Sequence, residues 1–132
     1  MKVGVTGTRE GATGYQLAEL RKVLAELKGT EFHHGDCEGV DAQAAQVARE
    51  LGYKIVCHPP QSEVLRAFVP ADEYRLPAGY LKRDRAIVDE CDILLVVPLH
   101  EERQPTGGTW YTHDYAVKTN KPYNVIWPKE KE

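Results

Sequence analysis

The chain of 132 residues carries 42% hydrophobic and 28% charged side chains, a composition typical of one globular domain spanning residues 1–132. Its formal net charge of −3, with acidic and basic residues interspersed, argues against a nucleic-acid partner recruited by long-range electrostatics. No apolar run approaches the roughly 18 residues that a membrane span needs, which argues against a membrane protein.

The N-terminus and the cysteines predict a cytoplasmic location. Met1 runs directly into "KVGVTG", without the charged region, apolar region and cleavage site of a secretory signal. The three cysteines are odd in number and widely spaced, at Cys37, Cys57 and Cys91. This spacing favours neither a disulfide framework nor a CxxC metal site, so we expect reduced thiols.

Short β-branched runs alternate with helical patterns along the first half of the chain. Residues 2–6 are predicted to form a strand, and a helix follows from a Thr13 N-cap, with Gln16 three residues later, to Gly29. A second strand covers residues 30–34. Asp41 is predicted to cap a helix that stops at Gly52, and a third strand follows at residues 53–58.

The second half begins with a proline-rich excursion over residues 59–78, in which a short helix is expected near residues 63–67. A helix at 79–92, a buried strand at 93–98, a helix from Gly108 or Thr109 to Asn120 and a strand at 123–127 complete the pattern. This alternation predicts an α/β fold: a single-domain, Rossmann-like, doubly wound and mainly parallel sheet of about five strands flanked by four helices.

Glycine-bearing polar loops follow three of the predicted strands: "TGTREG", "HGDCEGVD" and "PTGGTW". Ligands of open parallel sheets bind beyond the carboxyl ends of the strands. Glycines let the backbone approach a ligand, and the helix that starts after each loop favours an anion at its N-terminus. The sequence therefore predicts a site for a phosphorylated small molecule, with these lining residues: Gly7, Thr8, Arg9, His34, Gly35, Asp36, Gly39, Asp41, Arg83, Gly107, Gly108, Thr109 and Trp110.

Specific roles are predicted for the charged and aromatic members of this set. Arg9 or Arg83 would hold phosphate, because a guanidinium fork matches phosphate geometry. Asp36 or Asp41 would read a sugar, and Trp110 could stack on a base. The alternative is structural: Asp41 as a helix cap only, and Asp36 as a turn residue only.

Four stretches in this order, "GVTGTRE", "HHGDCEGVDAQA", "YLKRDRAIVDECDILLVVP" and "GGTWYTHDYA", resemble the SLOG superfamily. This Rossmann-like group joins DNA-processing protein A and the LOG cytokinin-activating hydrolases, and the chain is most similar to its YspA-like branch. The resemblance spans nearly the whole chain. It implies a nucleotide or nucleotide-derived ligand held by the three loops, and it makes a homo-oligomer plausible. DNA binding, by analogy with the DNA-processing protein, is disfavoured by the acidic charge balance.

An alternative function is hydrolysis of an N-glycosidic bond in nucleoside monophosphates. Hydrolytic members of the superfamily resemble "PGGxGTxxE", whose glutamate acts with an upstream arginine. This chain reads "PTGGTWYT", so the nearest acid is Asp114, and "KRDR" has Asp84 where an asparagine is expected. In this alternative the catalytic residues are Asp36 or Asp114 near the anomeric carbon and Arg83 on the phosphate.

A metal site is a third interpretation, because His33, His34, Cys37 and His58 are residue types that suit zinc. Adjacent strand residues point to opposite faces, so only one of the first two can join such a site. We therefore expect neither a metal nor another cofactor, with one histidine packed in the core and the other facing the ligand edge.

Overall fold

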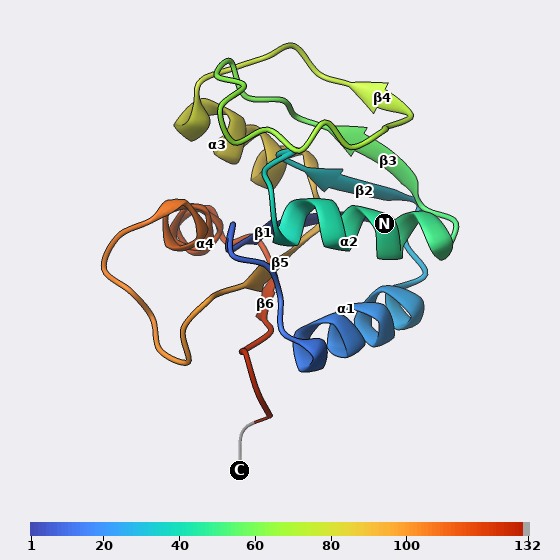
Figure 1. Cartoon of the computed structure of the whole chain (residues 1–132), viewed down its shortest axis with the longest axis vertical. Helices are drawn as coiled ribbons and strands as arrows, with labels where there is room; N and C mark the ends of the chain where they lie inside the picture. The colour runs from blue at the N-terminus through green and yellow to red at the C-terminus, as the bar shows by residue number, and fades with distance from the viewer. Residues whose placement is uncertain (131–132) are drawn as a thin grey trace.

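The computed structural model describes residues 1–130, in which six strands form one parallel sheet in the order β4-β3-β2-β1-β5-β6 (Figure 1). The last two residues of the predicted domain, 131 and 132, lie outside this description. The strands are β1 (Lys2–Gly7), β2 (Glu31–His34), β3 (Lys54–Cys57), β4 (Glu73–Tyr74), β5 (Ile93–Val97) and β6 (Tyr123–Val125). The helices are α1 (Gly14–Leu27), α2 (Val40–Glu50), α3 (Tyr80–Glu90) and α4 (Gly108–Lys118). The predicted doubly wound α/β fold is confirmed.

The helices form two layers, one on each face of the sheet (Figure 1). Helices α1 and α2 pack together over the larger core, which includes Leu20, Leu24 and Phe32, all fully buried. Helices α3 and α4 pack over a smaller core that includes Ile87, Leu94 and Ala116. Strand β1 lies at the centre between β2 and β5, where the order of the strands reverses and where open sheets of this kind bind ligands.

Helix α1 begins as its sequence predicts. Thr13 accepts a hydrogen bond from the Gln16 amide, and the Gln16 side chain accepts from the Thr13 amide, which completes a capping box. The buried Gln16 amide group also donates to the carbonyls of Pro98 and Ile126, at 2.8 and 2.9 Å. The start of α1 is therefore fastened to the ends of β5 and β6.

The proline-rich excursion differs from the prediction. Residues 63–67 form no helix, and the excursion instead supplies β4, a short strand parallel to β3. The reason is tertiary: the amide of Ala67 donates to the Asp36 carbonyl at 2.8 Å, and the Arg66 guanidinium binds the Asp36 carboxylate at 2.7 Å. These contacts hold the segment extended against the loop that follows β2.

The predicted capping role of Asp41 is also wrong. Gly39, with φ +85°, is the N-cap of α2, and Asp41 lies inside the first helical turn. Glycine is required at the cap because a Cβ there would lie 2.5 Å from the carbonyl oxygen of Arg9.

No helix among residues 1–130 combines the length and apolar character needed to cross a bilayer.

Candidate functional site

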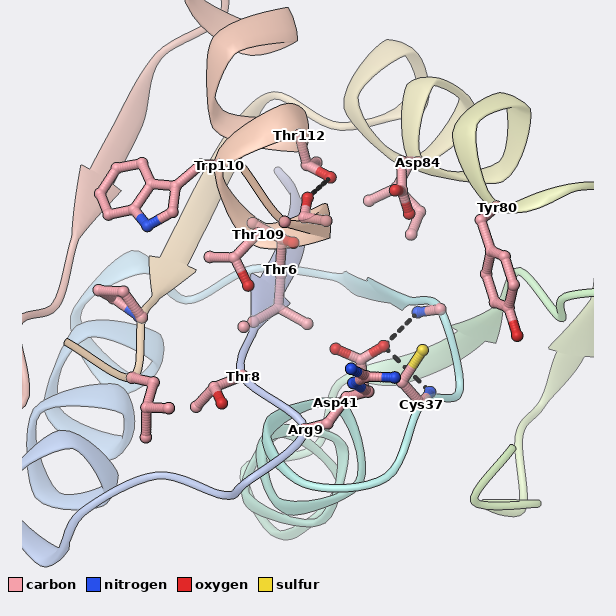
Figure 2. A pocket seen from close by; sticks show the side chains of 18 of the residues that line it. Thr6, Thr8, Arg9, Cys37, Asp41, Tyr80, Asp84, Thr109, Trp110 and Thr112 are labelled. Atoms are coloured by element: carbon pink, nitrogen blue, oxygen red, sulfur yellow. Dashed lines mark hydrogen bonds between the residues drawn. The ribbon is translucent and has the colours of Figure 1, made fainter. Parts of the chain in front are cut away.

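A cavity of about 620 Å³ opens at the carboxyl edge of the sheet, and all three glycine-bearing loops contribute to its wall (Figure 2). The predicted convergence of these loops on one cavity is confirmed. Ten of the predicted ligand-binding residues line it: Gly7, Thr8, Arg9, Gly35, Asp41, Arg83, Gly107, Gly108, Thr109 and Trp110. Four of the predicted site residues are not among its lining: His34, Asp36, Gly39 and Asp114.

The loop after β1 places a free cation on this wall. At Gly7 a Cβ would lie 2.4 Å from Cγ1 of Val40, so only glycine permits the close approach of β1 to α2. The Thr8 amide donates to the Val97 carbonyl, and the Thr8 carbonyl accepts from the Val40 amide. Arg9 follows in an exposed position, and its guanidinium makes no hydrogen bond or ion pair with the side chains of residues 1–130.

The loop after β2 uses its own amides internally. The amides of Gly35 and Cys37 both donate to Oδ2 of Asp41, at 3.0 and 3.2 Å (Figure 2). The Asp36 amide donates to Nδ1 of His34, and the Glu38 amide donates to a carbonyl of the proline-rich excursion. These four donors are therefore used within the protein and are not free for an anion. Burial raises the pKa of Asp41 to about 6, although the positive charge of a neighbouring arginine opposes the rise.

Arg83 lines the cavity, and each of its three nitrogens donates to a group of the protein. Its Nε donates to Asp84 at 2.8 Å, one terminal nitrogen donates to the Gly35 carbonyl, and the other lies 3.6 Å from the sulfur of Cys37. The side chain is 6% exposed, and these bonds hold the loop after β2 and helix α3 together. Burial also raises the pKa of Asp84, against the opposing charge of Arg83.

The N-terminus of α4 contributes the unused backbone donors. Gly107, with φ +106°, precedes the helix, no side chain caps it, and its first turn holds no acidic residue. The first intrahelical bond is the one from the Tyr111 amide to the Gly107 carbonyl. The amides of Gly108, Thr109 and Trp110 therefore lack helical acceptors, and together they form the positive end of the helix dipole.

The aromatic residue best placed for stacking is not the predicted one. The Trp110 ring is 5% exposed and packs against Trp127 and His113, with ring centroids 5.9 and 5.0 Å away. Tyr80, the first residue of α3, lines the cavity on its opposite side with 41% of its surface exposed (Figure 2). Sequence reasoning missed Tyr80. Its signal was an aromatic residue at a predicted helix start, just before "LKRDR".

The two carboxylates assigned to glycosidic hydrolysis are both neutralised outside the cavity. Asp36 is fully buried and pairs with Arg66 at 2.7 Å. Asp114 lies on the surface in a two-pronged pair with Arg103, at 2.6 and 2.7 Å, and this pairing lowers its pKa to about 2. Neither residue can reach a ligand in the cavity without breaking its ion pair. Asp41 and Asp84 are the carboxyl groups that the cavity contains.

No family model and no curated protein matches this chain. Several solved structures align with it. A molybdenum cofactor binding protein from Rippkaea orientalis aligns with 94% of this chain and 74% of its own, with a TM-score of 0.72 and 22% identity. The molybdenum cofactor carrier protein of Chlamydomonas reinhardtii aligns with 94% of this chain and 74% of its own, with a TM-score of 0.67 and 20% identity.

DNA processing protein A from Helicobacter pylori, described as binding single-stranded DNA, aligns with all of this chain and 67% of its own, with a TM-score of 0.68 and 20% identity. This protein represents the superfamily that the sequence motifs resemble, so the expected fold is confirmed. At this level of identity the likeness concerns the fold.

Proposed function

We propose that this chain binds a phosphorylated, nucleotide-like small molecule in the cavity at the carboxyl edge of the sheet. The observation that carries the proposal is the pairing, in one cavity, of the uncapped N-terminus of α4 with the unpaired guanidinium of Arg9. Three free amides, a helix dipole and an exposed cation are groups that hold phosphate in proteins. The phosphate belongs at Gly108 and Thr109.

The rest of the ligand follows from the other walls. Asp41 uses one carboxylate oxygen for two loop amides, and Figure 2 shows the other on the cavity side, where a sugar hydroxyl can donate to it. Tyr80 is 41% exposed and lies with its ring centroid 5.6 Å from the Arg83 guanidinium, and its remaining ring surface could contact a planar base. A volume of about 620 Å³ suits a ligand of nucleotide size.

The test is calorimetric titration with nucleoside mono- and diphosphates. The panel also includes the molybdenum cofactor and single-stranded DNA, because the structurally similar proteins are named for binding them. Arg9→Gln should weaken binding of a phosphorylated ligand about 10- to 100-fold, since a charge-assisted hydrogen bond contributes about 1.5–3 kcal/mol. Arg21→Gln, on the outer face of α1, is the matched control and should bind like the wild type.

A second pair of variants tests the helix end itself. Gly108→Pro removes one free amide at the first helical position, where proline fits because no intrahelical bond is lost. Gly108→Ala keeps that amide and adds a Cβ that clashes with nothing, 4.0 Å from Oδ2 of Asp84. Weaker binding in Gly108→Pro than in Gly108→Ala supports the phosphate position. Equal binding by both variants, or no saturable heat with any ligand of the panel, contradicts the proposal.

Hydrolysis of an N-glycosidic bond is the second candidate, and one observation favours it. The cavity holds two buried carboxyl groups of raised pKa, those of Asp41 and Asp84, and the charge of Arg83 acts on both. A carboxyl group that is partly protonated near neutral pH can donate a proton to a leaving base. The assay is release of free base from nucleoside monophosphates. Turnover that survives both Asp41→Asn and Asp84→Asn would reject this assignment.

A cytoplasmic location and a homo-oligomer remain sequence-based predictions. Size-exclusion chromatography coupled to light scattering tests the second directly.

A further inference from the structure

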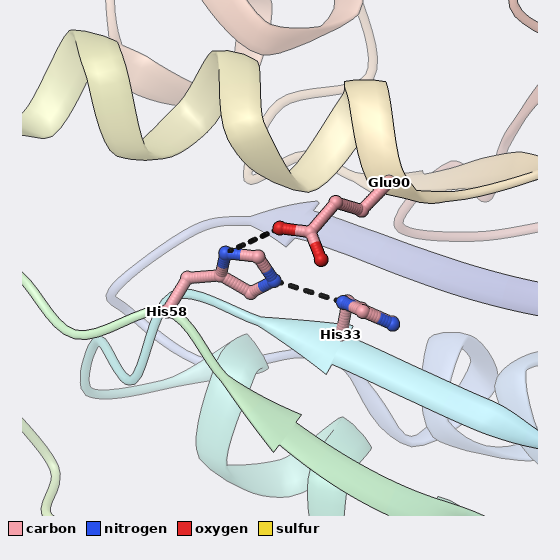
Figure 3. Close-up of side chains that lie close together, drawn as sticks. All are labelled: His33, His58 and Glu90. Carbon is pink, nitrogen blue, oxygen red and sulfur yellow. Dashed lines mark hydrogen bonds and ion pairs between the residues drawn. The ribbon is translucent and has the colours of Figure 1, made fainter. Parts of the chain in front are cut away.

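A second group of polar side chains lies away from the cavity, between the sheet and the end of α3 (Figure 3). His33 on β2 and His58 just after β3 are 0% and 2% exposed. Nδ1 of His33 lies 2.8 Å from Nε2 of His58, and Nδ1 of His58 lies 3.7 Å from Glu90. The far nitrogen of His33, Nε2, lies 2.9 Å from Glu31. None of these four residues lines the ligand cavity.

The two rings share one proton. Glu31 only accepts, so Nε2 of His33 carries a proton, and Nδ1 of His33 presents a lone pair to Nε2 of His58. Nδ1 of His58, at 3.7 Å, is too far from Glu90 for a hydrogen bond. If the proton of His58 moves from Nε2 to Nδ1, both nitrogens at the centre present lone pairs, and a metal ion can take the place of the shared proton.

We propose that this centre is a site for a divalent transition-metal ion of the zinc type, held by Nδ1 of His33, Nε2 of His58 and an oxygen of Glu90. One ligand atom from each of the three residues lies within 4.8 Å of the others. A tetrahedral zinc ion with Zn–N bonds of about 2.0–2.1 Å holds two nitrogens about 3.3 Å apart. The rings therefore need to separate by only about 0.5 Å from their 2.8 Å contact.

The surrounding groups fit the second layer of such a site. Glu31 accepts from the far nitrogen of His33, the arrangement that fixes the tautomer of a zinc-bound histidine. Arg75 donates to Oε1 of Glu90 from two nitrogens, at 3.0 and 2.8 Å, and so holds the carboxylate beside the two rings. The Glu90 side chain is 35% exposed, so the ion enters from that side and water completes its shell.

A neighbouring cluster of similar residue types is unsuited to a metal ion. His34, Asp36 and Cys57 also approach within 4.8 Å of one another on the opposite face of the sheet. However, Nδ1 of His34 accepts from the Asp36 amide, so its other nitrogen carries the proton, and the Asp36 carboxylate is held by Arg66 and by the Val69 amide. The two adjacent histidines do point to opposite faces, and only His33 offers a lone pair toward other ligands.

The test uses protein purified without a histidine tag and treated with a chelator. Titration with Co²⁺, followed by its visible absorption, and with Zn²⁺, followed by calorimetry, should show one ion per chain with tetrahedral absorption. His58→Gln should abolish this binding, and Glu31→Gln should weaken it about 10- to 100-fold. His113→Asn changes a histidine outside the cluster and should leave the stoichiometry and affinity unchanged.

Glu90→Gln is an independent test of metal binding if His58→Gln fails to fold. Glu90 lies at the surface end of α3, so this variant should retain the wild-type circular dichroism spectrum while it binds Co²⁺ at least tenfold more weakly. Binding that is the same in Glu90→Gln, Glu31→Gln and the wild type, or no Co²⁺ and Zn²⁺ binding at all, would overturn the assignment.

Discussion

Replacing Asp41 by asparagine should stabilise the protein, and the gain should depend on pH. The pKa of this carboxyl group is raised from 3.8 to about 6, mainly by burial. At about 1.36 kcal/mol per pKa unit, the ionised form costs the folded state about 3 kcal/mol. A single oxygen, Oδ2, accepts both the Gly35 and Cys37 amides. An asparagine oxygen in that position preserves both bonds while it removes the buried charge.

The sign of the effect follows from proton binding. Between pH 3.8 and about 6 the folded protein holds a proton on Asp41 that the unfolded chain has lost, so wild-type stability falls as pH rises through this window. The stability of Asp41→Asn does not fall in this way, because asparagine does not titrate. Its advantage in the free energy of unfolding should grow from near zero below pH 4 to about 3 kcal/mol above pH 6.

Urea unfolding of both proteins at pH 4, 5, 6 and 7 measures this difference. Comparing the two proteins cancels the contributions of buried histidines such as His34, whose pKa burial lowers to about 4. Asp89→Asn, on the exposed face of α3, controls for the general removal of one negative charge. A difference between Asp41→Asn and wild type that is constant with pH, or that shrinks as pH rises, would refute the reasoning.

Three further changes probe the framework of the cavity and the core through urea unfolding at pH 7. Gly7→Ala places a methyl group 2.4 Å from Val40 and should cost about 1–3 kcal/mol, with recovery when Val40→Ala is added; a lack of recovery would mean that the clash is not the cause. Thr13→Ala removes the capping box of α1 and should cost about 1 kcal/mol, and a neutral result would show that the box contributes nothing. Leu24→Ala, in the fully buried core, should cost about 2–5 kcal/mol, whereas Leu76→Ala, at 90% exposure, should change stability by less than about 0.5 kcal/mol; similar values for the two would contradict the assigned core.

Features that depend on neighbours in sequence were predictable. The capping box of α1 needs only Thr13 and Gln16, three residues apart, and both halves of it form. The convergence of the three glycine-bearing loops was predictable for a different reason: every strand is parallel, so all carboxyl ends meet at one edge. The opposite orientation of His33 and His34 follows from the twofold repeat of a strand.

Features that depend on partners distant in sequence were not predictable. Arg66 reaches Asp36 across 30 residues, and this pair both removes a predicted sugar-binding carboxylate and prevents the helix expected at residues 63–67. Strand β4 is two residues long, and its place comes from pairing with β3 and not from its own propensity. The pairing of His33 with His58 spans 25 residues and likewise leaves no local pattern.

The central position of β1 affects how the chain can be made. Its pairing with β2 involves residues up to 34, but its other edge pairs with β5, which ends at residue 97. At synthesis rates of about 5–20 residues per second, the ribosome needs roughly 3 to 13 seconds to make the intervening stretch. During that interval the middle strand of the future sheet has one bare edge, the geometry from which aggregation between nascent chains begins. Translation speed between residues 34 and 97 therefore bears directly on the yield of folded protein.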